Sequence, residues 1–279
     1  MQLRTAVLVG TVAVVGATGI GRAQNAASDI IDLSYALENE QGARVRAPWI
    51  ERELRQVAPP DLQAAPVVVA HPASVVLALL MLRVHQAVKV RSGVVTVLEP
   101  TSEHGRRGMD ELHEQTVNLL SFQQMPKDVF DAQVAFNMLS RYGEKSQPTI
   151  EMLEGRMVDH FRRITGGQVP VPSLMLLQAP IFHGHGFSLY LELEEAVPLA
   201  RIEGALASDH IAIARSEEEY PSNVNVAGQD GISVSLRQDG QRENGVWIWA
   251  AADNLRVLAL SAAECAEQMA AARPRGKVQ

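Results

Sequence analysis

The sequence has little of what several classes of protein require. It contains one cysteine, Cys265, which excludes an intramolecular disulfide framework and any metal site built from several cysteines. Basic residues are outnumbered, 25 Lys and Arg against 32 Asp and Glu, and a formal charge of −7 argues against nucleic acid as a partner. No internal apolar run is long enough to span a bilayer, so no membrane partner is expected. The composition that remains, 47% apolar and 20% charged, is typical of one large globular domain or two ordinary ones.

The first twenty residues have two interpretations. Ala6 to Ile20 is small and apolar and follows Arg4, which is the pattern of a signal peptide. The same segment also fits a buried strand that ends at Val15 and runs into the turn Gly16-Ala17-Thr18-Gly19. In nucleotide-binding sheets such glycines let the backbone approach a pyrophosphate. The residues alone favour the strand, and the signal peptide stays as the alternative.

The apolar pattern changes along the chain. Continuous apolar runs at Asp29–Leu33 and Pro66–Ala70 predict buried strands of the kind found in parallel sheets, and Val94–Leu98 predicts a further strand. Phe187–Glu194 alternates apolar and polar residues, which predicts a strand with one solvated face, and two similar segments follow it. Helices are predicted at 75–82, 107–122, 149–164 and 253–272, with a short helical stretch at 52–57. The predicted fold class is therefore α/β in the front part and α+β, with a mainly antiparallel sheet, in the larger part behind it.

Few residues stand out as chemical groups. His183 and His185 would share one face of an extended segment, but no spacing nominates a third ligand, so no metal site is predicted. His113-Glu114 resembles the start of a zinc-protease motif, but Val117 stands where the second histidine is required. Ser74 opens a helix after a buried strand, as an N-cap or as a nucleophile favoured by the helix terminus. Because no base lies beside it in the sequence, the cap is the favoured interpretation.

Several linked segments together resemble the aspartate-semialdehyde dehydrogenase family. In chain order they are Val12–Gly19, Ile30–Ser34, Gly108–Leu112, Ala135–Asn137, Pro180–Ser188 and Asp253–Arg256. The resemblance implies a strand rather than a signal peptide at the N-terminus. It also implies a truncated Rossmann-like nucleotide-binding part at 1–73, completed by the C-terminal helix 250–279, and a dimerisation domain at 74–249.

The catalytic residues of that family are mostly replaced. In the family reaction a cysteine thiolate attacks the aldehyde, a histidine acts as acid and base, and NADP accepts the hydride before phosphate releases the acyl group. The resemblance places His185 at the histidine and Ser74 at the cysteine. It places Glu99 at a glutamine that holds the intermediate, and Gln178 at the arginine that binds the substrate carboxylate. A hydroxyl is a far weaker nucleophile than a thiolate, and without the guanidinium the substrate loses a bidentate contact.

The cofactor of the family is NADP, and the resemblance would place it at Gly16, Thr18 and Gly19. Between Gly21 and Asp29 there are only seven residues, whereas a crossover between parallel strands needs about a dozen or more. We therefore expect no ordinary strand–helix–strand unit there, and we expect NADP binding to be weak or absent.

These departures predict a catalytically inactive paralogue that acts by dimerisation or partner binding, as a homodimer or as a heterodimer with an active homologue. Two enzymatic alternatives stay open. One is an NADP-dependent semialdehyde dehydrogenase with altered or residual activity, and the other is a hydrolase that uses Ser74 and His185. The lone thiol and the resemblance favour the cytoplasm. The short front part is also compatible with a chain shortened from a longer paralogue.

Overall fold

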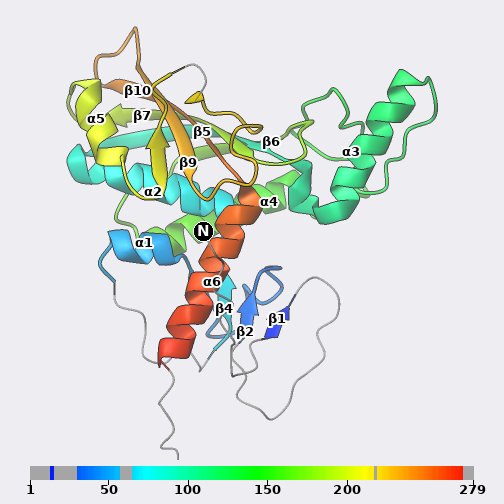
Figure 1. The fold of residues 1–279 in the computed structure, drawn as a ribbon, viewed down its shortest axis with the longest axis horizontal. Helices are drawn as coiled ribbons and strands as arrows, with labels where there is room; N and C mark the ends of the chain where they lie inside the picture. The colour runs from blue at the N-terminus through cyan, green and yellow to red at the C-terminus, as the bar shows by residue number, and fades with distance from the viewer. Residues whose placement is uncertain (1–12, 16–29, 57–64, 217–218, 273–279) are drawn as a thin grey trace, which may run out of the picture. The chain divides into compact units, whose positions relative to one another are not determined.

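The computed structural model describes residues 13–15, 30–56, 65–216 and 219–272 (Figure 1). The chain divides into two compact units, each treated separately below: unit 1 is residues 1–70 with 258–279, and unit 2 is residues 71–257. Gly16, Thr18 and Gly19, the predicted cofactor-binding residues, lie outside the described residues. Within the described ranges, no helix combines the length and the apolar character needed to cross a bilayer.

Unit 1 contains a four-stranded parallel sheet. Its strands are β1 (Ala13–Val15), β2 (Ile30–Asp32), β3 (Arg44–Arg46) and β4 (Val67–Val69), in the order β1-β2-β4-β3. The core of this unit joins the β-branched residues Ile31, Val67 and Val69 to Cys265 and Met269 of α6 (Asn254–Ala272). Burial raises the pKa of the Cys265 thiol to about 12, so the cysteine is a packing residue that stays protonated.

The parallel pairing of β1 with β2 differs from the expectation that the chain is too short there for a crossover between parallel strands. The short spacing between Gly21 and Asp29 argued against an ordinary crossover, yet the two strands are hydrogen-bonded neighbours and run parallel. Because β1 ends at Val15, the connection spans residues 16–29, which meets the length of about a dozen residues that a parallel crossover needs. The path of that connection lies outside the described residues.

The helix after β3 begins earlier than predicted. α1 covers Pro48–Glu53, whereas the pattern predicted a helical stretch at 52–57. Pro48 suits the first helical position, since its φ is already helical and no N–H is left unsatisfied. Trp49 and Ile50 are buried in the first turn, and Trp49 Nε1 donates to Glu264 Oε1 of α6 at 3.0 Å. The apolar residues that anchor the helix therefore lie at its start.

Unit 2 contains a six-stranded mixed sheet in the order β6-β5-β7-β10-β9-β8. The strands are β5 (Val90–Glu99), β6 (Ser173–Gln178), β7 (His185–Leu193), β8 (Ile211–Ile213), β9 (Ile232–Gln238) and β10 (Gly245–Ala252). The four central strands pair antiparallel, and β6 and β8 pair parallel at the two edges. The fold class predicted from the sequence is confirmed, although the two edge strands were not predicted.

Helices pack on one face of this sheet (Figure 1). α2 (Pro72–Ala87) is buried along most of its length and packs on α4 (Ile150–Thr165) and α5 (Leu199–Leu206). α4 starts at the predicted cap Thr149 and ends at Gly166, whose φ of +58° is the left-handed conformation that glycine adopts without strain. One turn of 3-10 helix, η1 (Thr101–His104), leads from β5 into α3 (Gly105–Leu120).

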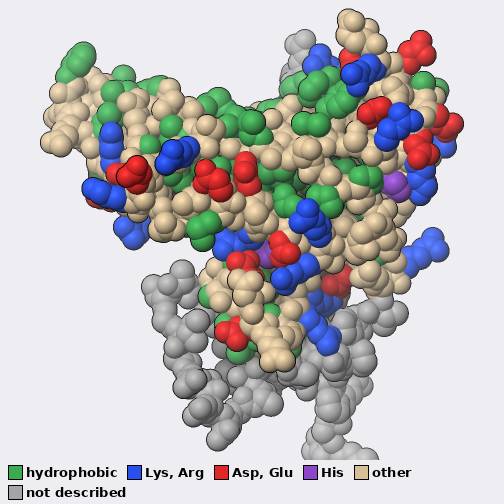
Figure 2. All heavy atoms as spheres, turned by 180° about the vertical axis from the view of Figure 1, so that it is seen from behind, with side chains coloured by type: hydrophobic (Ala, Val, Ile, Leu, Met, Phe, Trp, Pro, Cys, Tyr) green, Lys and Arg blue, Asp and Glu red, His purple; other side chains and the backbone are tan. Residues whose placement is uncertain are grey.

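Among the described residues, no helix of unit 2 packs on the opposite face of the sheet, which carries alternate residues of every long strand. The strand registers put the following side chains on it: Val94, Thr96, Leu98, Met175, Leu177, Ser188, Tyr190, Ser235, Arg237, Trp247 and Trp249. We call this set the open sheet face. Val94 and Met175 are each more than half exposed, and the Tyr190 and Trp247 rings lie 5.0 Å apart. Figure 2 shows apolar side chains gathered along the upper margin of the molecule, where this unit lies.

Candidate functional site

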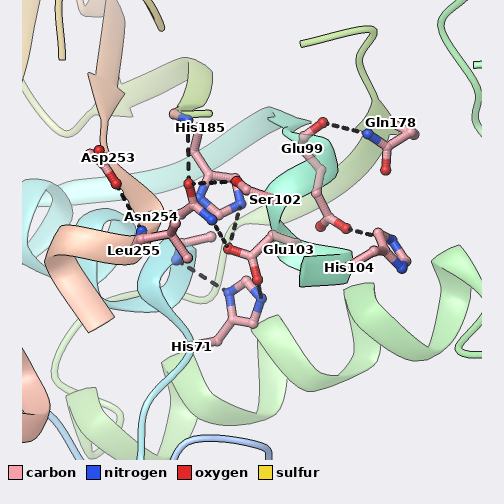
Figure 3. A network of polar contacts seen from close by, with 12 residues as sticks. His71, Glu99, Ser102, Glu103, His104, Gln178, His185, Asp253, Asn254 and Leu255 are labelled. Atoms are coloured by element: carbon pink, nitrogen blue, oxygen red, sulfur yellow. Dashed lines mark hydrogen bonds and ion pairs between the residues drawn. The ribbon is translucent and has the colours of Figure 1, made fainter. Parts of the chain in front are cut away.

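Five segments of unit 2 bring polar side chains together in one buried region (Figure 3). They are the start of α2, the end of β5, the turn η1, the start of β7 and the start of α6. Sequence analysis had nominated Ser74, Glu99, Gln178 and His185 from these or adjoining elements. The structure adds residues of η1 and of the α6 start, and it changes the role of Ser74.

His71, rather than Ser74, caps α2. The His71 Nδ1 accepts from the backbone N–H of Ala73 at 3.2 Å, and Pro72 takes the first helical position. A ring nitrogen that accepts a hydrogen bond carries no proton, so the neutral His71 ring holds its proton on Nε2. The His71 backbone N–H in turn donates to His160 Nδ1 at 3.0 Å. Burial, with the nearby His185 and His160 rings, lowers the pKa of His71 well below its ordinary value.

Ser74 is fully buried and points across to the neighbouring helix. Its hydroxyl donates to the Met157 carbonyl of α4 at 2.8 Å. A hydroxyl has one proton to donate, so Ser74 does not hydrogen-bond to His185 as a nucleophile would to its base. The prediction that Ser74 is an N-cap is wrong, because the turn begins three residues earlier, and the Ser74–His185 hydrolase gains no support.

His185 opens β7 with its ring buried. The side chain is 1% exposed, its Nε2 forms no hydrogen bond, and the Glu103 Oε1 atom lies 3.7 Å from that nitrogen. Burial lowers the pKa of His185 to about 3, so the imidazole is neutral near pH 7. His183 does not share its face, because Gly184 between them turns the chain at a φ of +82°. The described residues hold no group of three or more His, Cys, Asp or Glu side chains suited to a metal ion.

Glu103 of η1 is the residue that sequence reasoning missed. Its carboxyl lies between His71 and His185 and accepts from Asn254 Nδ2 at 2.9 Å. Burial, then the neighbouring Glu99 carboxyl, raise the pKa of Glu103 to about 8, while the Asn254 hydrogen bond opposes the rise. Nothing local marks Glu103 in the sequence, since it stands in a polar turn between a strand and a helix.

Asn254 connects three of the converging segments. Its Oδ1 accepts from Ser102 Oγ at 3.1 Å and from the Gly184 N–H at 3.3 Å, and its Nδ2 donates to Glu103. Asp253 caps α6 just before it, accepting from the N–H of Leu255 at 2.9 Å. In the sequence, the polar pair Asp253-Asn254 precedes an alanine-rich helix. This pair is the one local signal near the site, and it predicts only where the helix starts.

Glu99 and Gln178 belong to a second, fully buried group. Gln178 Nε2 donates to the carbonyls of Glu99 and Ala179 at 2.9 and 3.0 Å, and its Oε1 accepts from the Tyr142 hydroxyl at 2.8 Å. Tyr142 then accepts from His104 Nε2 at 3.0 Å, and burial raises its pKa further above the ordinary value. The amide of Gln178 is thus committed to protein groups. Both carboxyl oxygens of Glu99 are buried without a hydrogen bond, with His104 Nε2 at 3.6 Å from one of them.

The chain matches a family model described as semialdehyde dehydrogenase, dimerisation domain, over residues 81–257. It is 28% identical over 198 residues to an aspartate-semialdehyde dehydrogenase of Rickettsia bellii, a match that covers 69% of this chain and 58% of the relative. It is 31% identical to a USG-1 protein homolog of Pseudomonas aeruginosa, covering 84% of this chain and 69% of the relative. The Azotobacter vinelandii homolog is 32% identical, with 88% and 73% covered.

Solved structures resemble the fold over most of its length. A probable aspartate-semialdehyde dehydrogenase from Pseudomonas aeruginosa superposes with a TM-score of 0.75 at 28% identity, covering 88% of this chain and 73% of that one. Aspartate semialdehyde dehydrogenase II from Vibrio cholerae superposes with a TM-score of 0.74 at 20% identity over the same shares, a likeness of fold alone. The chain spans less than two thirds of the two Rickettsia dehydrogenases it matches at 28% and 27% identity.

Proposed function

Because the chain belongs to the semialdehyde dehydrogenase family, through that family's dimerisation domain, we propose that it is a dimer-forming member without dehydrogenase activity. The proposal has two parts, a missing reaction and a retained association, and each has its own support and its own test.

The group at the nucleophile position supports the first part most directly. Family resemblance puts the attacking thiolate at Ser74, and the Ser74 hydroxyl is fully buried and donates to the Met157 carbonyl at 2.8 Å. The candidate base, His185, has a pKa lowered to about 3 by burial, so it is a weak proton acceptor. An inaccessible hydroxyl, with a candidate base that accepts protons weakly, is unsuited to a covalent acyl transfer.

The substrate side of the site is also altered. Gln178, at the position of the family's arginine, has its amide oxygen and nitrogen bonded to Tyr142, Glu99 and Ala179. Glu99 puts a carboxyl where the family has a neutral amide, and it lies close enough to Glu103 to raise the pKa of that second carboxyl. An anionic aldehyde would lose its guanidinium contact and would meet the Glu99 carboxyl in place of an amide, which disfavours binding.

NADP binding by this chain is expected to be weak or absent. The residues that would hold its pyrophosphate by resemblance lie outside the described residues, so they provide no test of the fit. The start of α6, which faces the nicotinamide in the family, uses its Asn254 amide for Ser102, Gly184 and Glu103. In the part of the chain that the structure describes, that amide is committed to protein groups, which supports the expectation of weak binding.

The open sheet face supports self-association. Val94 and Met175 are 53% and 55% exposed, and the Tyr190–Trp247 aromatic pair lies on the same face. Large apolar side chains gathered on one unpaired sheet face are typical of interaction surfaces. The family model that covers these strands is itself named for dimerisation, and a second copy of this chain is therefore the proposed partner.

Activity is tested by following NADP reduction with aspartate semialdehyde and phosphate, beside the dehydrogenase from Vibrio cholerae as the positive control. We expect no turnover above the uncatalysed rate. Loss of a catalytic nucleophile lowers the turnover rate by far more than a factor of about 100. Turnover within that factor of the control would therefore refute the absence of dehydrogenase activity.

Association is tested by light scattering after size-exclusion chromatography. The wild type should have the mass of a dimer, and Val94→Asp should have the mass of a monomer because a carboxylate would be buried in the interface. Met152→Asp is the matched control, since Met152 is 54% exposed on α4, away from the open sheet face. A monomeric wild type, or an unchanged dimer in the Val94 variant, would contradict this surface.

A further inference from the structure

The Glu103 carboxyl stands between two buried imidazoles. Its Oε2 is 3.6 Å from His71 Nε2, and its Oε1 is 3.7 Å from His185 Nε2. The Glu103 side chain is 13% exposed and the two histidine side chains are 2% and 1% exposed. Three titratable groups therefore share a nearly dry space, in which any uncompensated charge is costly.

Hydrogen bonds around the three groups fix where most of the protons lie. Because His71 Nδ1 accepts from Ala73, the His71 proton is on Nε2 and faces Glu103 Oε2. Asn254 Nδ2 donates to Glu103 Oε1. The orientation of this amide is fixed because its Oδ1 accepts from Ser102 Oγ and from the Gly184 N–H. The His185 Nε2 atom is buried without a hydrogen bond, and Glu103 Oε1 lies 3.7 Å from it.

We propose that Glu103 is protonated on Oε1 and donates that proton to His185 Nε2, so that the pair shares one proton and carries no charge. Oε1 would then donate to His185 and accept from Asn254, while Oε2 accepts from His71. A movement of less than about 1 Å brings the 3.7 Å separation to an O–H···N distance of about 2.8 Å. Both Glu103 oxygens and the Nε2 atoms of His71 and His185 then have complementary partners.

The Glu103 carboxyl therefore acts as an internal hydrogen-bond donor to His185, which is the one catalytic residue of the family that this chain retains. This inference rests on the proposed function for the role of His185, and it adds a reason why that nitrogen is not free to accept a proton from a substrate. Glu103 is thus a positioning residue that holds His185 in its neutral form. The inactive site has an autoinhibitory contact in addition to its missing thiol.

The surrounding charges agree with a neutral pair. The groups that face Glu103 come from five places in the fold: His71 at the N-cap of α2, Glu99 of β5, Arg156 of α4, His185 of β7 and Asn254 of α6. Burial and Glu99 raise the pKa of Glu103 to about 8, against smaller opposing effects of Asn254 and Arg156. Burial lowers the pKa of His185 to about 3, so the shared proton belongs to the carboxyl.

The first test is nitrogen NMR of the histidine rings in the full chain, with His185 assigned from the signals lost in His185→Asn. We expect the His185 ring to stay neutral from pH 5 to pH 8, with Nε2 shifted as a hydrogen-bond acceptor. An imidazolium signal for His185 at pH 6 to 7 would overturn the proposal, since the pair would then be an ion pair.

The second test is Glu103→Gln, which has the shape of a neutral carboxyl but not its hydrogen-bonding capacity. An amide nitrogen cannot accept a hydrogen bond. If the new amide donates to His185, its nitrogen lies against the Asn254 Nδ2 donor. If the amide is flipped, its nitrogen lies against the His71 Nε2–H donor instead. We expect Glu103→Gln to lower the denaturation midpoint, while Glu114→Gln, at an exposed site on α3, leaves it unchanged. A Glu103 variant as stable as the wild type would contradict the shared proton.

The pH profile separates this role from simple packing. A carboxyl whose pKa is raised on folding binds its proton more tightly in the folded state, so its stabilisation is lost as pH rises towards 8. The lowered histidine pKa values have the opposite effect, but only below their unfolded value of about 6.5. Wild-type stability should therefore fall between pH 6.5 and pH 8, and Glu103→Gln should lose that slope. Equal slopes would overturn the shared proton, whereas the turnover and light-scattering assays decide the proposed function.

Discussion

Replacing Ser74 by cysteine restores the family's nucleophilic atom, and the structure predicts that the new thiol remains unreactive. Ser74 has no exposed surface, and the candidate base His185, with a pKa of about 3, does not accept a thiol proton at neutral pH. The thiol also replaces the hydroxyl that donates to Met157, and a thiol is a weak donor. Loss of that hydrogen bond should destabilise the fold by about 1 kcal/mol, as should Ser74→Ala.

The size of the effect follows from the cysteine that the chain already has. Cys265 is fully buried, and burial raises its pKa to about 12. A thiol of that pKa is ionised to about one part in 10⁴ at pH 8, whereas an exposed thiol of pKa about 8.5 is ionised to about a quarter. If burial acts on S74C as it acts on Cys265, its native-state labelling should be about 10³-fold slower than that of an exposed thiol.

The assay is the rate of disulfide exchange with an aromatic disulfide reagent at pH 8, measured on the folded protein. The exposed reference is Ser121→Cys at the end of α3, and the wild type gives the background from Cys265. Labelling of S74C at the rate of S121C, or the appearance of semialdehyde turnover in S74C, would refute the reasoning that the site is closed and lacks a base.

Three further predictions concern other parts of the molecule. Glu99→Leu should raise the free energy of unfolding by about 1–3 kcal/mol, because both carboxyl oxygens are buried without hydrogen bonds; a loss measured in guanidinium would contradict this. Glu51→Ala should cost about 3 kcal/mol by leaving the 3%-exposed Arg46 guanidinium without its ion pair, whereas exposed Glu40→Ala should cost less than about 0.5 kcal/mol in the same titration. Equilibrium titration should find NADP binding weaker than about 100 μM, an affinity of less than about 6 kcal/mol, and micromolar binding would show that the cofactor site is intact.

The sequence alone determined most of the elements and the missing chemistry, but not the edge strands β6 and β8. Alternation in Phe187–Glu194 gave an antiparallel strand, continuous apolar runs such as Pro66–Ala70 gave parallel ones, and Gly166 ended α4. These features are local, since the period of a strand and the left-handed turn of a glycine depend on neighbouring residues. The missing nucleophile is also determined by the sequence alone, because residue 74 is a serine and its hydroxyl cannot supply a thiolate in any fold.

Tertiary structure alone decided which polar groups meet. Glu103 lies in an unremarkable polar turn, and its partner Asn254 is 151 residues away, so no local pattern could join them. The same holds for Ser74, whose hydroxyl proton goes to a carbonyl 83 residues along the chain rather than to His185. Burial acts only once these segments have come together, and it is burial that raises the pKa of Glu103 and lowers that of His185.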